Sequence, residues 1–206
     1  MLLQVYPDSI NNRHIQTVVE RLKGNGVVII PTDTVYAFAC DIHSSKAIER
    51  ICKIKNVKLT QANFSFACYD LSHISEYTKP FSREVFRIMK HNLPGPFTFI
   101  LNASSEVPNI FRSNKKTIGI RVPDNNITRE IVKGLGNPIM VSSVHDEDEI
   151  KEYYTDASEI ETHFAAQVDI IVDGGYSDIY PSTIIDCTSD TPVVIREGKG
   201  KIEEID

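Results

Sequence analysis

The sequence lacks any apolar run of the roughly 18 residues that a membrane span requires. The first six residues form too short an apolar run for a secretion signal, and no basic flank precedes them. We therefore expect a cytoplasmic protein with no membrane partner. Repeats, low-complexity tracts and Gly/Ser linkers are also missing, so we expect residues 1–206 to fold as a single domain.

Short-spaced cysteine pairs are missing as well. The four cysteines lie in apolar surroundings and form no C-x-x-C motif, which predicts reduced core residues and no metal site. The sequence has no GxxxxGK[ST] motif and no defensible Ser/His/Asp or Cys/His arrangement. A P-loop enzyme and an enzyme with a covalent nucleophile are therefore not indicated.

The charge is unevenly distributed along the chain. Residues 1–133 carry 18 Lys and Arg against 11 Asp and Glu, whereas residues 134–206 carry 4 against 17, which gives the net charge of −6. The first part of the chain can therefore form a basic cleft for a phosphate-bearing ligand. Solvated surface charge of both signs explains the same counts, and no single residue separates the two interpretations.

Helical and extended patterns alternate along the chain, which predicts an α/β sheet with helices packed on it. Helices are expected over residues 11–23, 45–54, 82–91, 126–135 and 156–168. Strands are expected over residues 27–30, 63–69, 97–101, 117–122, 139–143, 169–173, 183–187 and 193–196.

The run VVII at residues 27–30 is typical of a strand that is covered on both faces. Pro31 ends this strand because it has no amide hydrogen for a ladder, and the polar residues Thr32, Asp33 and Thr34 follow. Open α/β sheets usually bind ligands at the carboxyl ends of their strands. An ordinary Thr/Asp turn explains the same residues, so the pattern alone leaves both possibilities open.

Four ordered segments together resemble the YrdC/YciO family, which includes the threonylcarbamoyl-adenylate synthases. They are residues 31–36 (PTDTVY) with Cys40 and Asp41, 94–101 (PGPFTFIL), 117–123 (TIGIRVP), and 181–186 (PSTIID) with 196–198 (REG). The resemblance implies a twisted, open, mixed sheet with flanking helices and a cationic concave pocket. It also implies an enzyme that converts ATP, L-threonine and bicarbonate into threonylcarbamoyl-AMP and pyrophosphate, for the tRNA modification threonylcarbamoyladenosine.

The resemblance further implies roles for particular residues. Mg²⁺ would arrive with ATP and be held mainly by the phosphates and water. Lys53, Lys55 and Arg121 are the expected catalytic residues. Lys53, Lys55, Asn63, Thr117, Ser143 and Arg196 are expected to bind the nucleotide, and Thr34, Arg121 and Ser182 to bind the amino acid.

Lys53 and Lys55 match a K-x-R motif of the family, with Lys in place of Arg. Two residues that are two apart point about 200° apart on a helix but to the same side of an extended segment. They can therefore act as a pair only if the helix has ended by Lys53. Two surface lysines at a helix end are the alternative.

Arg121 lies within an otherwise apolar strand, between Ile120 and Val122. A buried guanidinium is costly unless it is paired, so Arg121 is expected to face either a ligand pocket or a structural ion-pair partner. Strand alternation predicts that its two neighbours point into the core on the opposite face.

Two departures from the family pattern resemble the YciO branch. His145 stands where the family has Asn, followed by the acidic run 146–149, which is expected to be a solvated loop although a Mg²⁺ site is the alternative. Cys68 aligns with the histidine that contacts threonine in the synthases. A thiol cannot supply the hydrogen bonds of an imidazole, so threonine-dependent activity is expected to be weak or absent.

The competing interpretations are a double-stranded RNA-binding protein, with which this fold family has been associated, and a catalytically diverged paralogue. The net charge of −6 argues against strong nonspecific RNA binding, although a local basic surface can still bind RNA. The sequence leaves the oligomeric state open.

Overall fold

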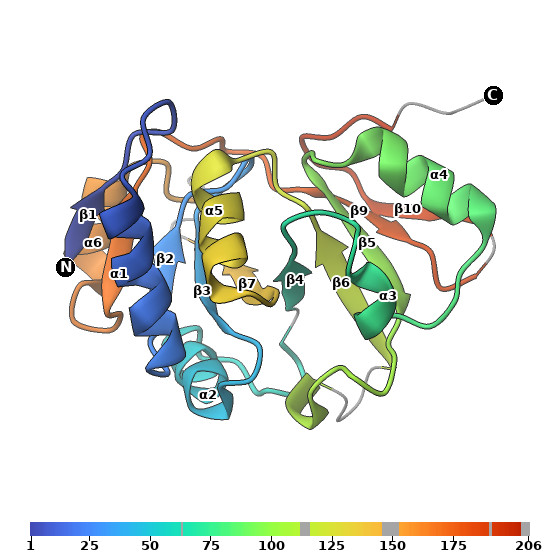
Figure 1. The fold of residues 1–206 in the computed structure, drawn as a ribbon, viewed down its shortest axis with the longest axis horizontal. Coiled ribbons are helices and arrows are strands. Elements are labelled where there is room, and N and C mark those ends of the chain that lie inside the picture. The colour runs from blue at the N-terminus through green and yellow to red at the C-terminus, as the bar shows by residue number, and fades with distance from the viewer. Residues whose placement is uncertain (63, 112–115, 146–152, 190, 203–206) are drawn as a thin grey trace.

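A single open sheet passes through the whole molecule in the computed structural model (Figure 1). The structure describes residues 1–62, 64–111, 116–145, 153–189 and 191–202. In these residues the sheet has ten strands in the order β1-β8-β2-β3-β7-β4-β6-β5-β9-β10. The strands are β1 (Leu2–Gln4), β2 (Val28–Ile30), β3 (Ala37–Asp41), β4 (Ser65–Ala67), β5 (Phe97–Asn102), β6 (Thr117–Arg121), β7 (Ile139–Ser143), β8 (Ile170–Asp173), β9 (Thr183–Asp186) and β10 (Val193–Arg196).

The sheet is mixed, as predicted. β1, β8 and β2 are parallel neighbours, β4 is parallel to β6, and β5 is parallel to β9. The remaining neighbours are antiparallel. The helices are α1 (Asn12–Lys23), α2 (Ser45–Ile54), α3 (Ile74–Tyr77), α4 (Arg83–Asn92), α5 (Asn126–Leu135) and α6 (Ala157–Phe164), with a 3₁₀ turn at Asn109–Phe111.

The helix ends follow from capping residues. The Asn11 side chain accepts a hydrogen bond from the Arg13 amide at the start of α1, and Asn125 does the same for Thr128 at the start of α5. α5 ends at Gly136, whose φ of +88° favours glycine. α6 begins at the predicted place but ends at Phe164 and not near residue 168, because the chain turns there before β8.

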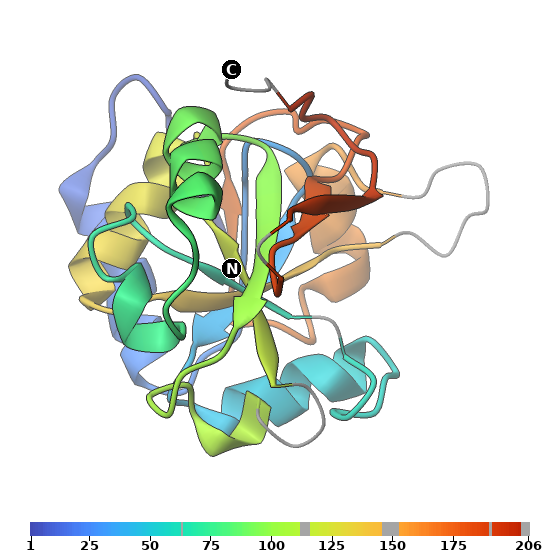
Figure 2. The same cartoon turned by 90° about the vertical axis from the view of Figure 1, so that its right-hand side faces the viewer.

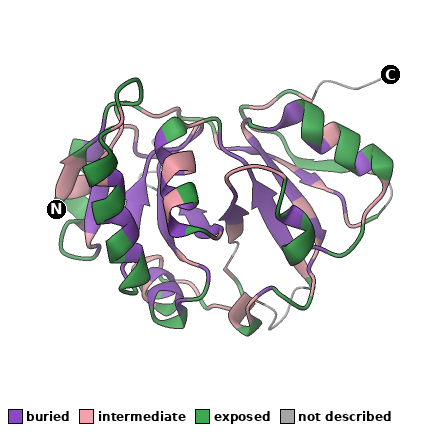
Figure 3. Ribbon diagram, viewed as in Figure 1, coloured by how far each residue is buried: buried purple, intermediate pink, exposed green. Residues whose placement is uncertain are grey.

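Two apolar clusters lie on opposite faces of the sheet. One contains buried side chains of α2, α3, α4 and α6, and the other contains those of α1 and α5. In Figure 2, α1 and α5 (blue and yellow) lie on one side of the central strands and α6 (orange) on the other. In Figure 3 the central strands are coloured as buried, whereas α1 and α4 have many exposed residues.

The face that carries α1 and α5 has two different halves. Among the described residues, the apolar cluster under these helices extends across β8, β2, β3 and β7 and reaches no further than Ala67 of β4. We call this region the covered half. The same face continues over β6, β5 and β9, and we call that region the open half.

The open half is polar, because alternate residues of β6 point to this face. Thr117, Gly119 and Arg121 share it by alternation, while Ile118 and Ile120 join the cluster on the other face. A Cβ atom on Gly119 would lie 2.7 Å from the Ser65 hydroxyl and 3.1 Å from a Thr98 methyl group. Glycine is therefore needed here, where polar side chains of neighbouring strands meet.

Candidate functional site

The connection from β2 to β3, residues 31–36, is held in a fixed shape by its own threonines. The Thr32 hydroxyl donates to the Val35 carbonyl at 2.7 Å and accepts from the Thr34 amide at 3.1 Å. Both threonines are buried. The Thr128 hydroxyl of α5 donates to the Pro31 carbonyl, so this segment is fixed to the covered half at its beginning.

Asp33 reaches from this segment to Arg121 on the open half. Nη2 of Arg121 donates to Asp33 Oδ1 at 2.9 Å and to Thr34 Oγ1 at 3.0 Å. The two charged side chains are only 9% and 7% exposed. Burial lowers the pKa of Arg121 from its ordinary value, Asp33 raises it, and the nearby charge of Arg196 lowers it.

This ion pair is incomplete. Asp33 Oδ2 and Arg121 Nε are buried and have no hydrogen-bond partner among the described residues. A buried polar atom without a partner costs about 1–3 kcal/mol, and more when it carries charge. One acceptor and one donor therefore remain for a ligand with matching groups.

Arg121 meets both expectations drawn from its place in the strand. Ile120 and Val122 lie in the core cluster on the other face, as predicted. The ion-pair alternative is also realised, because Asp33 is a protein carboxylate. Arg121 nevertheless faces Thr34 and has not turned away from the proposed pocket.

Ser182 lies beside this pair, at the start of β9. Its hydroxyl is 2.8 Å from the Thr98 hydroxyl of β5, and the Arg196 guanidinium donates to the Ser182 carbonyl at 2.7 Å. Ser182 is buried, whereas Arg196 is exposed. The structure thus brings together Thr34, Arg121, Ser182 and Arg196, which the sequence places far apart.

Lys199 is a cation at this site that the sequence interpretation missed. Its ammonium donates to the Asp33 carbonyl at 2.7 Å and pairs with the Asp178 carboxylate at 3.1 Å. Burial alone would raise the pKa of Asp178, but hydrogen bonds from the Tyr180 amide, Lys199 and the Ile179 amide lower it. A possible signal was the spacing of Lys199 three residues after Arg196, just past the matched 196–198 segment.

Asp33, Asp178 and Lys199 border a cavity of about 520 Å³, a size typical of small-molecule sites, whereas Arg121, Ser182 and Arg196 are not among its lining residues. A second cavity of about 420 Å³, near α3 and α4, is lined by none of the residues predicted from the sequence. The residues that line the first cavity are Thr32, Asp33, Thr34, Tyr176, Ser177, Asp178, Ile179 and Lys199.

A second polar group lies at the carboxyl end of β7. Lys55 donates from Nζ to the Ser143 carbonyl at 2.5 Å and lies 5.6 Å from the centre of the Phe38 ring. Burial lowers the pKa of Lys55 to about 8. The Ser143 hydroxyl is 2.9 Å from His145 Nε2. Because the Val144 amide donates to the Tyr36 carbonyl, this group borders the end of segment 31–36.

Lys53 does not form a pair with Lys55. α2 extends to Ile54, so the condition that the helix end by Lys53 is not met. Lys53 is exposed on the helix, and the two side chains point in nearly opposite directions.

Cys68 lies on the wrong face for the histidine it was aligned with. Its neighbour Ala67 is opposite Arg121 in the sheet, whereas Cys68 itself belongs to the core cluster behind the sheet. Burial, with Asp70 nearby, raises the pKa of its thiol to about 12. The prediction of a reduced core cysteine is therefore confirmed for Cys68. Its side chain does not reach the pocket face, because a one-residue step along a strand reverses the side chain.

Two further predictions are only partly placed. Thr117 is half-buried at the start of β6, where it pairs with Asn102. Asn63 and the acidic run 146–149 lie outside the described residues. Within the described part of the chain, no three His, Cys, Asp or Glu side chains gather closely enough to hold a metal ion, and none of its helices is long and apolar enough to span a membrane.

Comparisons with known proteins relate this geometry to a family. The family model Sua5_yciO_yrdC, described as "Telomere recombination", matches residues 20–198. The uncharacterized protein YciO of Escherichia coli K12 is 41% identical over 97% of this chain and 96% of its own length. The crystal structure of E. coli YciO superposes with a TM-score of 0.90, at 39% identity and 98% coverage of both chains.

Two further relatives have lower sequence identity to this chain. A putative threonylcarbamoyl-AMP synthase of Methanocaldococcus jannaschii is 31% identical over 99% of this chain and 96% of its own. The crystal structure of Pyrococcus abyssi Sua5 complexed with L-threonine has a TM-score of 0.87 at 25% identity. This chain matches 57% of that chain with 96% of its own length.

Proposed function

Since the chain belongs to the Sua5–YciO–YrdC family, we propose that it is a nucleotidyltransferase of the threonylcarbamoyl-AMP synthase type. The proposed reaction consumes ATP, an amino acid such as L-threonine, and bicarbonate, and yields a carbamoyl-adenylate and pyrophosphate. The product would serve the threonylcarbamoyladenosine modification of tRNA. The synthase names of the more distant relatives support this reaction type.

The observation that carries the proposal is the incomplete ion pair of Asp33 and Arg121. Its spare donor and acceptor are buried at the open half. The Thr34 and Ser182 hydroxyls and the charges of Arg196 and Lys199 surround it. This combination suits a ligand with carboxylate, amine and phosphate groups.

The chemistry needs no nucleophile from the protein. Bicarbonate takes up a proton and loses water to give carbon dioxide. The amino group of the substrate attacks the carbon dioxide and loses a proton, which gives a carbamate. A carbamate oxygen then attacks the α-phosphorus of ATP, the bond to the bridging oxygen breaks, and pyrophosphate leaves. The protein has to hold the two reactants in line and neutralise the charge that develops.

Each described residue has a role that its position supports. Arg121 would bind the substrate carboxylate, with Thr34 and Ser182 as hydroxyl contacts. Arg196 and Lys55 would approach the phosphates. Lys53, exposed on the far side of α2 from Lys55, would contribute only from a distance.

Mg²⁺ fits this site only as a companion of ATP. The Asp33 carboxylate is engaged by Arg121 and no described carboxylate cluster is preformed. When bound, the ion would neutralise the phosphate oxygens, with phosphate and water as its main ligands.

The residue at position 145 bears on which amino acid is the substrate. His145 lies against Ser143, where the synthases have the shorter Asn. We expect weak threonine-dependent activity, and a gain from His145→Asn. Cys68→His is not expected to help, because the imidazole would enter the core.

Calorimetric titration with ATP, followed by threonine-dependent release of pyrophosphate, tests the proposal. Arg196→Ala and Lys55→Ala should each weaken ATP binding by about 1–3 kcal/mol, the usual worth of a charge-assisted hydrogen bond. Lys23→Ala, an exposed change on α1, is the matched control. Absence of ATP binding, combined with a salt-dependent RNA gel shift, would replace the enzyme by the RNA-binding alternative.

A further inference from the structure

The loop that joins β8 to β9, residues 174–182, is firmly attached to the site. Figure 1 shows it crossing above the sheet from β8 to β9. The Tyr36 hydroxyl donates to the Gly175 carbonyl at 2.6 Å and accepts from the Gly174 amide at 3.2 Å. Burial raises the pKa of Tyr36 to about 12, so this hydroxyl keeps its proton.

The far part of the loop is attached as well. The Asp178 amide donates to the Thr34 carbonyl at 2.8 Å, and the Ser177 amide donates to the Thr155 carbonyl at 2.9 Å. The Asp178 carboxylate pairs with Lys199. The backbone of the loop is therefore fixed relative to Asp33 and Thr34.

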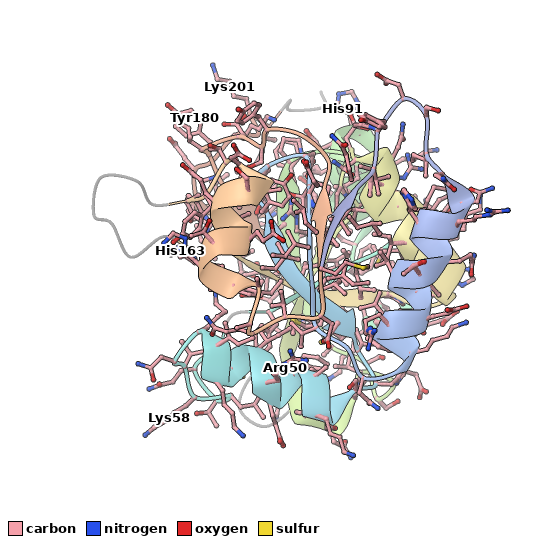
Figure 4. The ribbon with its side chains drawn as sticks, turned by 90° about the vertical axis from the view of Figure 1, so that its left-hand side faces the viewer. Arg50, Lys58, His91, His163, Tyr180 and Lys201 are labelled. Carbon is pink, nitrogen blue, oxygen red and sulfur yellow. The ribbon has the colours of Figure 1, made fainter. Side chains whose placement is uncertain are left out.

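This fixed loop nevertheless presents large apolar side chains to solvent. Tyr176 is 84% exposed, Ile179 58% and Tyr180 59%. Tyr180 projects from the surface at the end of the molecule away from Arg50 and Lys58 (Figure 4). Exposed apolar side chains that gather beside a cavity mark a binding surface more often than isolated ones do.

Tyr176 and Ile179 also line the 520 Å³ cavity, together with Thr32, Asp33 and Lys199. The loop thus contributes an aromatic and an aliphatic side chain to the cavity, beside the polar Ser177 and Asp178, while segment 31–36 and Lys199 contribute hydroxyl, carbonyl and ammonium groups. A nucleotide has the matching division, because a flat apolar base is joined to a charged phosphate chain.

We propose that Tyr176 is a stacking platform for the base of the nucleotide, with Ile179 as its apolar neighbour. This inference rests on the proposed function and adds the position of the base. The phosphates then extend past Lys199 towards Arg196. Base–aromatic stacking typically changes affinity by about tenfold to a hundredfold on substitution by alanine.

Calorimetric titration of the full chain with ATP and with inorganic tripolyphosphate tests the platform. Tyr176→Ala should weaken ATP binding roughly tenfold and leave tripolyphosphate binding unchanged, since tripolyphosphate has no base. Tyr176→Phe keeps the ring and should retain the affinity for ATP. Tyr6→Ala, at a tyrosine that is 61% exposed after β1, is the matched control and should change neither titration.

The possible results separate the two proposals. If Tyr176→Ala binds ATP as tightly as the wild type, the platform is overturned and the proposed function stands. If it loses ATP and tripolyphosphate equally, Tyr176 only maintains the loop, which also overturns the platform. If the wild-type chain binds no ATP, the proposed function itself fails, and the platform with it.

Discussion

The covered half and the open half belong to one face of one sheet, yet they differ in what packs on them. α1 and α5 bury the covered half under side chains such as Val19 and Ile131. The open half instead carries Arg121, Thr98 and Ser182, joined by hydrogen bonds to each other or to segment 31–36. A ligand can reach polar groups only where helices do not cover the sheet. The position of the candidate site is therefore decided by where the helices stop.

The two halves are joined by segment 31–36. Pro31 is held by α5 of the covered half, and Asp33 and Thr34 contact Arg121 of the open half. A rigid, well-packed half can thus position groups on a polar half that has little apolar packing of its own on this face. Substitutions on the two sides should consequently have different effects on stability and on binding.

The largest expected effect comes from removing the carboxylate that joins the halves. Asp33→Ala leaves the Arg121 guanidinium buried and unpaired, and should lower the free energy of unfolding by about 3–5 kcal/mol. Urea denaturation measures the change. The double variant Asp33→Ala/Arg121→Met removes both charges and should recover much of the loss. A loss below about 1 kcal/mol for Asp33→Ala would mean that Arg121 is already solvated.

A similar but smaller loss is expected in the covered half, without an effect on binding. Ile131 is fully buried on α5, and Ile131→Ala should cost about 2–5 kcal/mol by leaving a cavity. The affinity for ATP, measured below the melting temperature, should stay as in the wild type. A loss of ATP affinity in Ile131→Ala would contradict the separation between a covered half that provides stability and an open half that binds the ligand.

The smallest effect concerns Lys55, which borders segment 31–36. Its folded pKa is near 8, below its ordinary value of 10.5, so the unfolded chain binds more protons between these two pH values. The contribution of Lys55 to stability should therefore rise with pH from about 8 to 10.5. The buried thiols of Cys40, Cys68 and Cys187, whose pKa values are raised, contribute a fall in stability once the pH exceeds the ordinary thiol value. The difference in slope between the wild type and Lys55→Met isolates the Lys55 contribution, so the variant should gain less stability, or lose more, across this range. Lys53→Ala on the exposed face of α2 should have the slope of the wild type. The same slope in Lys55→Met would assign it to another group.

The sheet was largely predictable, because apolar runs such as residues 27–30 are favourable only in a strand that is covered on both faces. β1 and α3 were missed, since three and four residues are too short to show a period. β3 was also missed, because its mostly buried run Ala37–Asp41 follows the polar segment 31–36 directly and shows no alternation. β10 was predicted as a strand, but its exposed position at the edge of the sheet depends on strand order, which the sequence does not show.

The site was predictable in its residues more than in its contacts. The family resemblance selected Thr34, Arg121, Ser182 and Arg196, which the structure brings together. The pairing of Arg121 with Asp33 spans 88 positions, and such a contact depends on the tertiary fold. Cys68 lies in the core, as its apolar surroundings predicted, although the family alignment placed it at the position of a ligand-contacting histidine. One residue of register separates the pocket face from the core.

The most direct test of the account is an amide chemical-shift titration of the labelled protein with ATP. We expect the largest shifts on segment 31–36, at Arg121 and Ser182, and along residues 196–199, with little change on α1 and α5. Shifts concentrated on α1 and α5, or around the second cavity near α3 and α4, would contradict the assignment of the open half as the nucleotide site.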